Sequence, residues 1–197
     1  MTKFFMNLFE KAGLVDESND EIVKTGITRL ENLLLDFLFA SIISGILGNF
    51  LVGILFEFCY MVLRIYAGGY HASTPRKCLC FTYGSTLACM IFIFILPMTK
   101  YIFAVLIAVF IGTIFLTTPI QSENKPLCNT EKKVYRRNSV FIAVAETGLF
   151  ALLVLWEKYL YAKTVFVSMA LVVTGLMIEI AKKKVAYFQI KENNTDS

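Results

Sequence analysis

Two stretches without a charged residue follow one another in the middle of the chain. Residues 79–98 and 101–120 contain twenty residues each, and only Thr99 and Lys100 separate them. A helix of twenty residues is about 30 Å long, which matches the hydrocarbon core of a bilayer. Because 57% of the 197 residues are hydrophobic, more than a soluble domain of this size needs for its core, the sequence predicts an integral membrane protein.

Four further spans are predicted, which makes an all-α protein with about six transmembrane helices. Residues 140–156 and 164–180 are apolar runs that carry one carboxylate each, Glu146 and Glu179. Residues 30–66 are too many for one crossing and break most naturally at Gly48 and Asn49. The two helices of this hairpin are less apolar than the other predicted spans, because they contain Asp36, Glu57 and Arg64.

The distribution of lysine and arginine orients these helices, since both residues accumulate on the cytoplasmic side. If the N-terminus is inside, all but three of the 19 lysines and arginines fall in cytoplasmic segments. The exceptions are Lys100, Lys158 and Lys163. We therefore expect a multi-pass protein of the cell membrane, with both termini, the loop around His71 and the loop after Ile120 in the cytosol.

The first fifteen residues predict an amphipathic helix on the membrane surface. Phe5, Leu8 and Phe9 have the spacing of one helical face, whereas Glu10 and Lys11 interrupt the apolar stretch that a signal peptide would need. We find no internal repeat and expect a single membrane domain. Its expected order is an interfacial helix over 1–15, a hairpin over 30–66, a loop over 67–77, two spans over 79–120, a basic loop over 121–139, two spans over 140–180 and a tail over 181–197.

The five cysteines show neither a disulfide framework nor a metal site. Two of them, Cys59 and Cys89, fall inside predicted spans, where they are best explained as small packing residues. Cys78 and Cys80 form a C-x-C pair, but a chain with one histidine and no other cysteine cluster cannot complete an ordinary metal site around them. We expect no structural disulfide, no metal and no cofactor.

The stretch "RIYAGGYHASTPRKCLCF", residues 64–81, contains the only histidine of the chain, His71. Gly68 and Gly69 favour the end of the preceding helix, because glycine adopts left-handed conformations at little steric cost. Pro75, preceded by Thr74 as a cap, favours the first position of a new helix. The sequence therefore predicts a loop that carries His71 and a helix that begins just before Cys78.

This position favours a reactive Cys78. The unpaired amides at a helix N-terminus and the adjacent cations Arg76 and Lys77 stabilise a thiolate. His71, on the loop just before the helix, can reach back to act as the base. The residues alone leave a second interpretation open, in which His71 is a solvated surface residue and Cys78 is incidental.

The same stretch resembles the signature of the AgrB family, the accessory gene regulator protein B family of membrane-embedded cysteine endopeptidases in bacterial quorum sensing. The matching positions are Arg64, the run over 67–72 with Gly69 and His71, and Cys78. The likeness extends over most of the chain, including the amphipathic start, the multiple spans and the "TTPI" and "NKP" stretches at 117–120 and 124–126.

The resemblance implies an enzyme that removes the C-terminal part of an AgrD-like amphipathic propeptide and closes the remainder into a thiolactone or lactone. It implies Cys78 as the nucleophile and His71 as the base, with Arg64 and Gly69 in structural support. The partners that it implies are the propeptide, membrane lipid and, as one option, a second copy in a homodimer; no nucleic acid is expected. The competing hypothesis is a peptide exporter or membrane scaffold without covalent chemistry.

The other charges allow alternatives that the sequence does not rank. Glu57 and Arg64 are seven residues apart and are expected to pair, although Glu57 could instead orient His71. Asp36 and Glu146 compete for the place of a third catalytic residue. The loop "EKKVYRRNS" is either a topology signal that meets anionic lipid or a receptor for an acidic propeptide tail. Its basic residues are Lys132, Lys133, Arg136 and Arg137.

Overall fold

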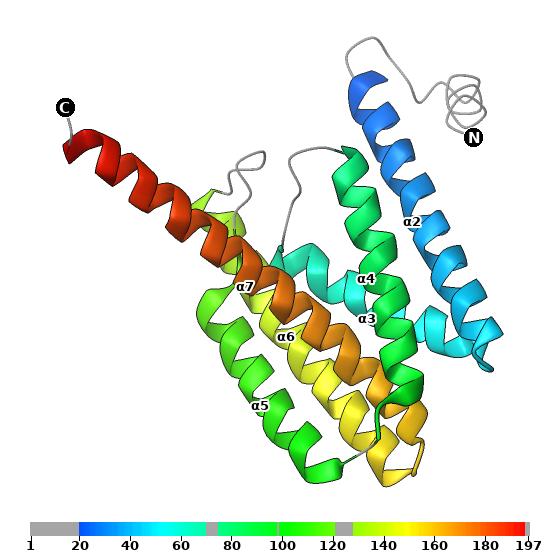
Figure 1. Cartoon of the computed structure of the whole chain (residues 1–197). Coiled ribbons are helices and arrows are strands. Elements are labelled where there is room, and N and C mark those ends of the chain that lie inside the picture. Colours follow the sequence, from blue (N-terminus) through cyan, green and yellow to red (C-terminus); the bar gives the residue numbers. More distant parts are fainter. Residues whose placement is uncertain (1–19, 70–74, 98, 121–127, 196–197) are drawn as a thin grey trace.

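The computed structural model describes residues 20–69, 75–97, 99–120 and 128–195, and this part of the chain folds into six helices without a strand. They are α2 (Asp20–Ile46), α3 (Phe50–Ala67), α4 (Pro75–Ile95), α5 (Lys100–Thr117), α6 (Asn129–Leu155) and α7 (Tyr159–Thr195), shown in Figure 1. The all-α prediction is confirmed. The interfacial helix expected over 1–15 lies outside the described residues.

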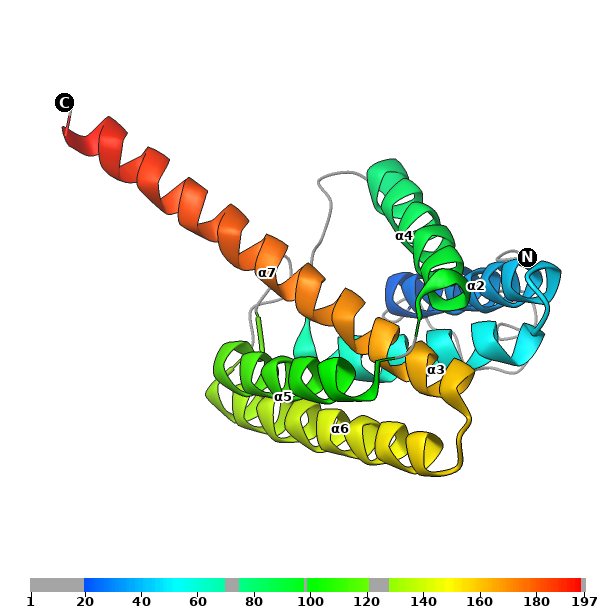
Figure 2. The ribbon, with the colours of Figure 1, turned by 60° about the horizontal axis from the view of Figure 1, so that its bottom comes forward.

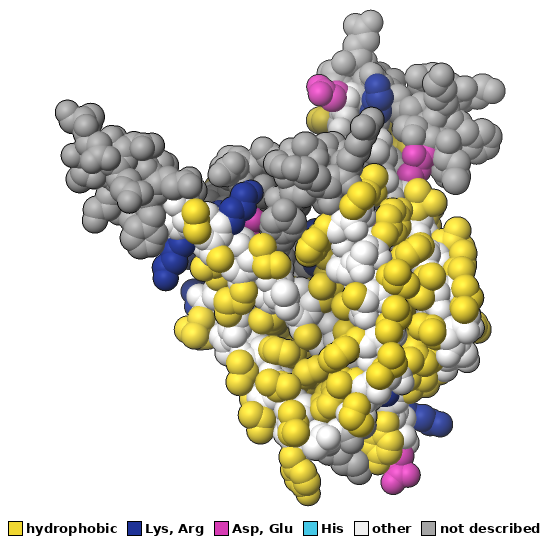
Figure 3. Space-filling model, in the orientation of Figure 1, with side chains coloured by type: hydrophobic (Ala, Val, Ile, Leu, Met, Phe, Trp, Pro, Cys, Tyr) yellow, Lys and Arg dark blue, Asp and Glu magenta, His cyan; other side chains and the backbone are white. Residues whose placement is uncertain are grey.

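Three of these helices contain segments that are long and apolar enough to cross a membrane. The segments are Phe50–Ala67, Asn129–Leu155 and Tyr159–Val185; the apolar parts of α4 and α5, Leu79–Ile95 and Tyr101–Thr117, are shorter. α2, the first helix of the predicted hairpin, is not among these segments. Hydrophobic side chains cover most of the face shown in Figure 3, and the visible charged side chains gather toward its two ends. The chain is therefore a helical membrane protein.

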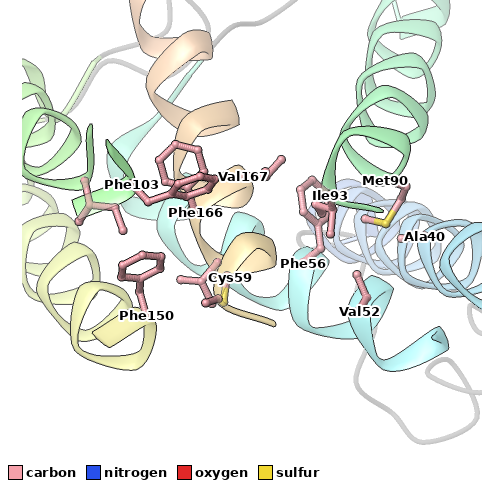
Figure 4. Packing of buried hydrophobic residues seen from close by; sticks show 13 residues of the cluster. Ala40, Val52, Phe56, Cys59, Met90, Ile93, Phe103, Phe150, Phe166 and Val167 are labelled. Atoms are coloured by element: carbon pink, nitrogen blue, oxygen red, sulfur yellow. The ribbon is translucent and has the colours of Figure 1, made fainter. Parts of the chain in front are cut away.

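α3 and α7 form the centre of the bundle. α3 packs against α2, α6 and α7, while α7 also contacts α4 and α5. In Figure 2, α5 and α6 lie side by side below α7, and α2 lies on the opposite side of α7. In the core, the rings of Phe103 and Phe166 lie 4.4 Å apart, close to Phe150 and Cys59 (Figure 4). The helices alternate in direction, so the end of α3 and the starts of α4 and α6 lie at one end of the bundle (Figure 1).

The break between the first two helices is where the sequence predicts it. Gly48 has φ +116°, and the Asn49 side chain caps α3 by accepting a hydrogen bond of 3.1 Å from the Leu51 N–H. The Ser44 hydroxyl oxygen, on α2, accepts a 3.0 Å hydrogen bond from the Gly53 N–H of α3. Polar side chains thus fasten the turn of the hairpin from both helices.

Some helices extend beyond the predicted spans. Hydropathy indicates where the chain leaves the bilayer, whereas a helix can continue into water. α6 begins at Asn129, within the stretch 121–139 that was expected to be a loop, and α7 continues past Ile180 to Thr195. The start of α6 is a capping box in which the Cys128 sulfur accepts from the Glu131 N–H and the Glu131 carboxylate accepts from the Cys128 N–H. Cysteine is not a preferred N-cap residue, so the sequence pattern does not predict that a helix starts here.

The contact between α2 and α3 at Gly53 yields a first prediction. A Cβ atom at this position would lie 2.3 Å from the Ala40 carbonyl oxygen, so Gly53→Ala must push the two backbones apart. We expect the variant to lose about 1–3 kcal/mol of unfolding free energy, measured by reversible unfolding in detergent micelles. Gly112→Ala is the control, because a Cβ on Gly112 meets nothing within 4 Å. Equal stability of the Gly53 variant and the control would contradict the close packing of this hairpin.

Candidate active site

The structure confirms the helix start and leaves part of the predicted site outside its described residues. α4 begins at Pro75, so the backbone of Cys78 lies in the first turn of a helix, as predicted. His71 and the side chain of Cys78 are not among the described groups. Arg64 lies in the last turn of α3, and Gly69 follows two residues after the end of that helix.

Gly68 ends α3 in a conformation and a position that suit glycine. Its φ is +82°, and its N–H donates a 3.0 Å hydrogen bond to the Arg64 carbonyl. A Cβ on Gly68 would lie 2.6 Å from the Ile120 carbonyl oxygen, and the Ile120 N–H donates a 3.2 Å hydrogen bond to the Ala67 carbonyl. The segment after α5 therefore packs directly against the point where the motif leaves α3.

Arg64 is held by a tyrosine and lies near two carboxyl groups. Its Nη1 donates a hydrogen bond to the Tyr60 hydroxyl, and the guanidinium lies 5.3 Å from the centre of the Tyr60 ring. Its charge interacts with both Asp36 and Glu57. A Cβ on Gly69 would lie 4.0 Å from the Arg64 Nε, so the arginine side chain runs beside this glycine.

Glu57 of α3 is buried and faces α4. It is 2% exposed and accepts a 3.4 Å hydrogen bond from the Thr86 hydroxyl of α4. The predicted pairing of Glu57 with Arg64 stays a prediction. The alternative, that Glu57 orients His71, stays untested.

The two rival carboxylates lie in different surroundings. Asp36 of α2 interacts with Glu57 and Arg64. Glu146 of α6 interacts instead with Cys59, and neither of its carboxylate oxygens has a hydrogen-bond partner within the described part of the chain. Asp36 thus belongs to the polar group that includes the motif arginine, whereas Glu146 belongs to a separate one.

A small cavity opens beside Arg64, between α3, α4 and α7. Its volume of about 10 Å³ is close to that of one water molecule. Its walls are Tyr60, Arg64, Gly68, Gly69, Phe81, Leu171, Val172 and Gly175. Phe81 comes three residues after Cys78 in α4, and residues three apart share a helix face about 4.5 Å apart along the axis.

The basic segment is a helix rather than the expected loop, and this arranges its charges. Lys132 and Arg136 form one row at i, i+4 on α6, and Lys133 and Arg137 form the adjacent row. Arg136 also has a structural contact, because its Nη2 donates a 3.2 Å hydrogen bond to the Phe115 carbonyl and its guanidinium lies 5.2 Å from that ring's centre. The four predicted residues are therefore not equivalent.

Two contacts bring the basic helix next to the motif. The ring of Tyr135, on α6, lies 5.6 Å from the ring of Tyr66, near the end of α3. The hydroxyls of Ser139 and Thr118 lie 2.9 Å apart, where they share a hydrogen bond. Sequence reasoning missed these residues because their partners are distant in the chain. Tyr60 could have been found, since it precedes Arg64 by one helical turn.

Within residues 20–69, 75–97, 99–120 and 128–195, no group of three or more His, Cys, Asp or Glu side chains is placed to hold a metal ion. Cys59, Cys80, Cys89 and Cys128 are free thiols.

These features define a helical membrane protein with a polar site at one end of its bundle, around Arg64 near the end of α3. Residues 1–180 match the family model described as Accessory gene regulator B, and the chain therefore belongs to the AgrB family. Neither the curated proteins nor the solved structures contain a match to it. Family membership connects the protein with the accessory gene regulator system of quorum sensing.

Proposed function

We propose that the protein is a membrane cysteine endopeptidase that cleaves the C-terminal part from a quorum-sensing propeptide and promotes cyclisation of the remainder. Cys78 is the nucleophile and His71 is the general base. The observation that carries this proposal is the place of Cys78 in the first turn of α4, one helical turn before Phe81, which lines the cavity beside Arg64. The family match over residues 1–180 is consistent with a peptidase.

Sequence separation limits the distance between His71 and this helix start. His71 is four residues before Pro75, so extended-chain length allows at most about 14 Å between them. The amides of the first helical turn stabilise a thiolate nearby. A nucleophile and a base within reach of each other are the minimum requirement for covalent acyl transfer.

The proposed reaction has two acyl transfers. His71 takes the proton of the Cys78 thiol, the sulfur attacks the scissile carbonyl carbon, and the departing amine receives the proton from His71 as the C–N bond breaks. The product is an acyl-thioester on Cys78. His71 then takes the proton of an internal cysteine or serine of the same peptide as that residue attacks this carbonyl. Cys78 leaves as a thiolate, regains the proton from His71, and the peptide is released as a thiolactone or a lactone.

Ring closure must be faster than hydrolysis of the thioester. A nucleophile on the same peptide has an effective molarity of up to about 10⁵ to 10⁸ M when it is well oriented, far above the concentration of water. A thioester also keeps the acyl group activated, so a second thiol exchanges with little change in bond energy. Burial of the intermediate among membrane helices would exclude water further.

The basic face of α6 is proposed to receive an acidic C-terminal tail of the propeptide. Lys132, Lys133 and Arg137 present their charges from neighbouring rows of one helix, and Tyr135 of the same helix contacts Tyr66 beside the motif. A tail bound there would hold the scissile bond near the end of α3. Anionic lipid is the competing ligand of the same charges.

Both termini and the site are proposed to face the cytosol. The structure supports this orientation with charge placement: Lys158 and Lys163 lie where α6 meets α7, whereas the basic helix start lies at the opposite end of the bundle, with the motif. Cys128, an exposed residue at that helix start, provides the test.

For this test, Cys128 is kept as the only cysteine and intact cells are treated with a membrane-impermeant maleimide. We expect labelling only after permeabilisation. A cysteine-free protein carrying Lys158→Cys, in the exposed turn at the other end, is the control and should be labelled from outside. The reverse pattern would overturn the orientation.

The catalytic assignment predicts different roles for two neighbouring cysteines. Co-expression with a candidate propeptide, amphipathic and carrying an internal cysteine or serine and an acidic tail, is followed by mass spectrometry. Cys78→Ala and His71→Ala should each reduce cleavage by at least about a thousandfold, because nucleophile and base act as a unit. Cys80→Ala should retain most activity, since residues two apart point to nearly opposite sides of a helix.

Membrane insertion and helix content are measured for each variant, so that loss of folding is recognised. Activity in Cys78→Ala would exclude the proposed peptidase and favour the non-enzymatic exporter or scaffold. Activity lost in Cys80→Ala but kept in Cys78→Ala would also reject the helix-start argument.

The proposed tail site predicts a salt-dependent effect on substrate binding. The triple variant Lys132→Gln, Lys133→Gln, Arg137→Gln should raise KM roughly tenfold at low salt, since each exposed ion pair contributes about 0.2–1 kcal/mol. Added salt should raise the wild-type KM toward that of the variant, because it screens the same charges. The matched control replaces Lys182, Lys183 and Lys184 of α7, which are also exposed. Equal KM changes in both triple variants would assign the α6 charges to general membrane electrostatics.

A further inference from the structure

The cavity beside Arg64 is lined mostly by carbon atoms, with one guanidinium among them. Leu171, Val172 and Phe81 form apolar walls, and Gly68 and Gly69 bring the backbone of the motif to its edge. Its volume of about 10 Å³ has room for one water-sized group, so a single oxygen atom fits. A positive charge in the wall selects an oxygen that carries negative charge.

The guanidinium is fixed before any ligand arrives. The Tyr60 hydroxyl accepts a hydrogen bond from Nη1, and the Tyr60 ring lies under the guanidinium. The carboxyl groups of Asp36, on α2, and Glu57, on α3, lie near enough to interact with its charge, and the Thr86 hydroxyl of α4 donates a hydrogen bond to Glu57. A preorganised donor of this kind stabilises charge without having to rearrange during the reaction.

We infer that this cavity binds the carbonyl oxygen of the peptide bond that Cys78 attacks, with Arg64 as the binding residue and Tyr60 as its positioning residue. The inference rests on the proposed function, because it needs an acyl transfer at Cys78. Its location is consistent with that reaction, since Phe81 in the cavity wall follows Cys78 by one helical turn.

The charge on this oxygen appears twice in the reaction. When the Cys78 sulfur forms its bond to the carbonyl carbon, the π electrons move to the oxygen, and they return when the C–N bond breaks. When the internal thiol or hydroxyl attacks the thioester, the oxygen again takes the electrons, and they return as the bond to Cys78 breaks. Arg64 therefore lowers the barrier of cleavage and of ring closure alike.

The test uses Tyr60→Phe, which keeps the ring and removes the hydroxyl, in the full-length protein in lipid nanodiscs. The probe is the candidate propeptide that the wild-type protein cleaves. We expect kcat to fall about tenfold and KM to stay within about twofold, because the lost interaction acts on the transition state. Tyr161→Phe is the matched control: its hydroxyl accepts a 2.9 Å hydrogen bond from Asn49 at the other end of the bundle, and kcat should not change.

A second variant shows whether Tyr60 acts through Arg64. In an Arg64→Lys background, which keeps the charge but loses the planar guanidinium, adding Tyr60→Phe should reduce kcat by less than about twofold. A full tenfold reduction in that background, an unchanged kcat in the single variant, or an effect confined to KM would each overturn the inference. Cys78→Ala separates the two proposals: if it stays active, the peptidase itself fails and the inference with it.

Discussion

The charge of Arg64 is the constraint around which the site end of the bundle is arranged. A guanidinium within an apolar helical protein needs hydrogen-bond acceptors and opposite charge nearby, because lipid supplies neither. Tyr60 supplies an acceptor one turn earlier on the same helix, and the carboxyl groups of Asp36 and Glu57 interact with the charge. Asp36 comes from α2, which packs against α3, whereas the small cavity beside the guanidinium lies between α3, α4 and α7.

Close backbone approach provides the second condition for this arrangement. Lipid-exposed helices gain little from the hydrophobic effect between them, so small residues that permit tight contact become important. Gly53 lets α2 reach α3, and Gly68 lets the Ile120 carbonyl reach the end of α3. The second contact joins the end of α5 to the motif, and Thr118 continues this connection to Ser139 on α6. The motif and the basic helix are thereby held at one end of the molecule.

Much of the framework could be predicted from local pattern. The break at Gly48 and Asn49, the end of α3 at the glycine pair and the start of α4 at Pro75 all depend on the backbone preferences of a few adjacent residues. The ends of α6 and α7 could not be predicted in this way, because membrane hydropathy does not report where helical hydrogen bonding stops. The Cys128 cap of α6 adds to this difficulty, since it uses an unusual capping residue.

The sequence by itself determined that the chain is a helical membrane protein and that a helix begins just before Cys78, because apolar length and proline act locally. Only the tertiary structure decided which residues surround Arg64. Glu57 and Tyr60 belong to its own helix, but Asp36 and the cavity walls from α4 and α7 come from elsewhere in the chain. The tertiary structure also distinguished Arg136 from Lys132, Lys133 and Arg137, because the Arg136 guanidinium donates a hydrogen bond to the Phe115 carbonyl. These distinctions depend on contacts between distant segments, and such contacts follow from how helices pack rather than from the order of neighbouring residues.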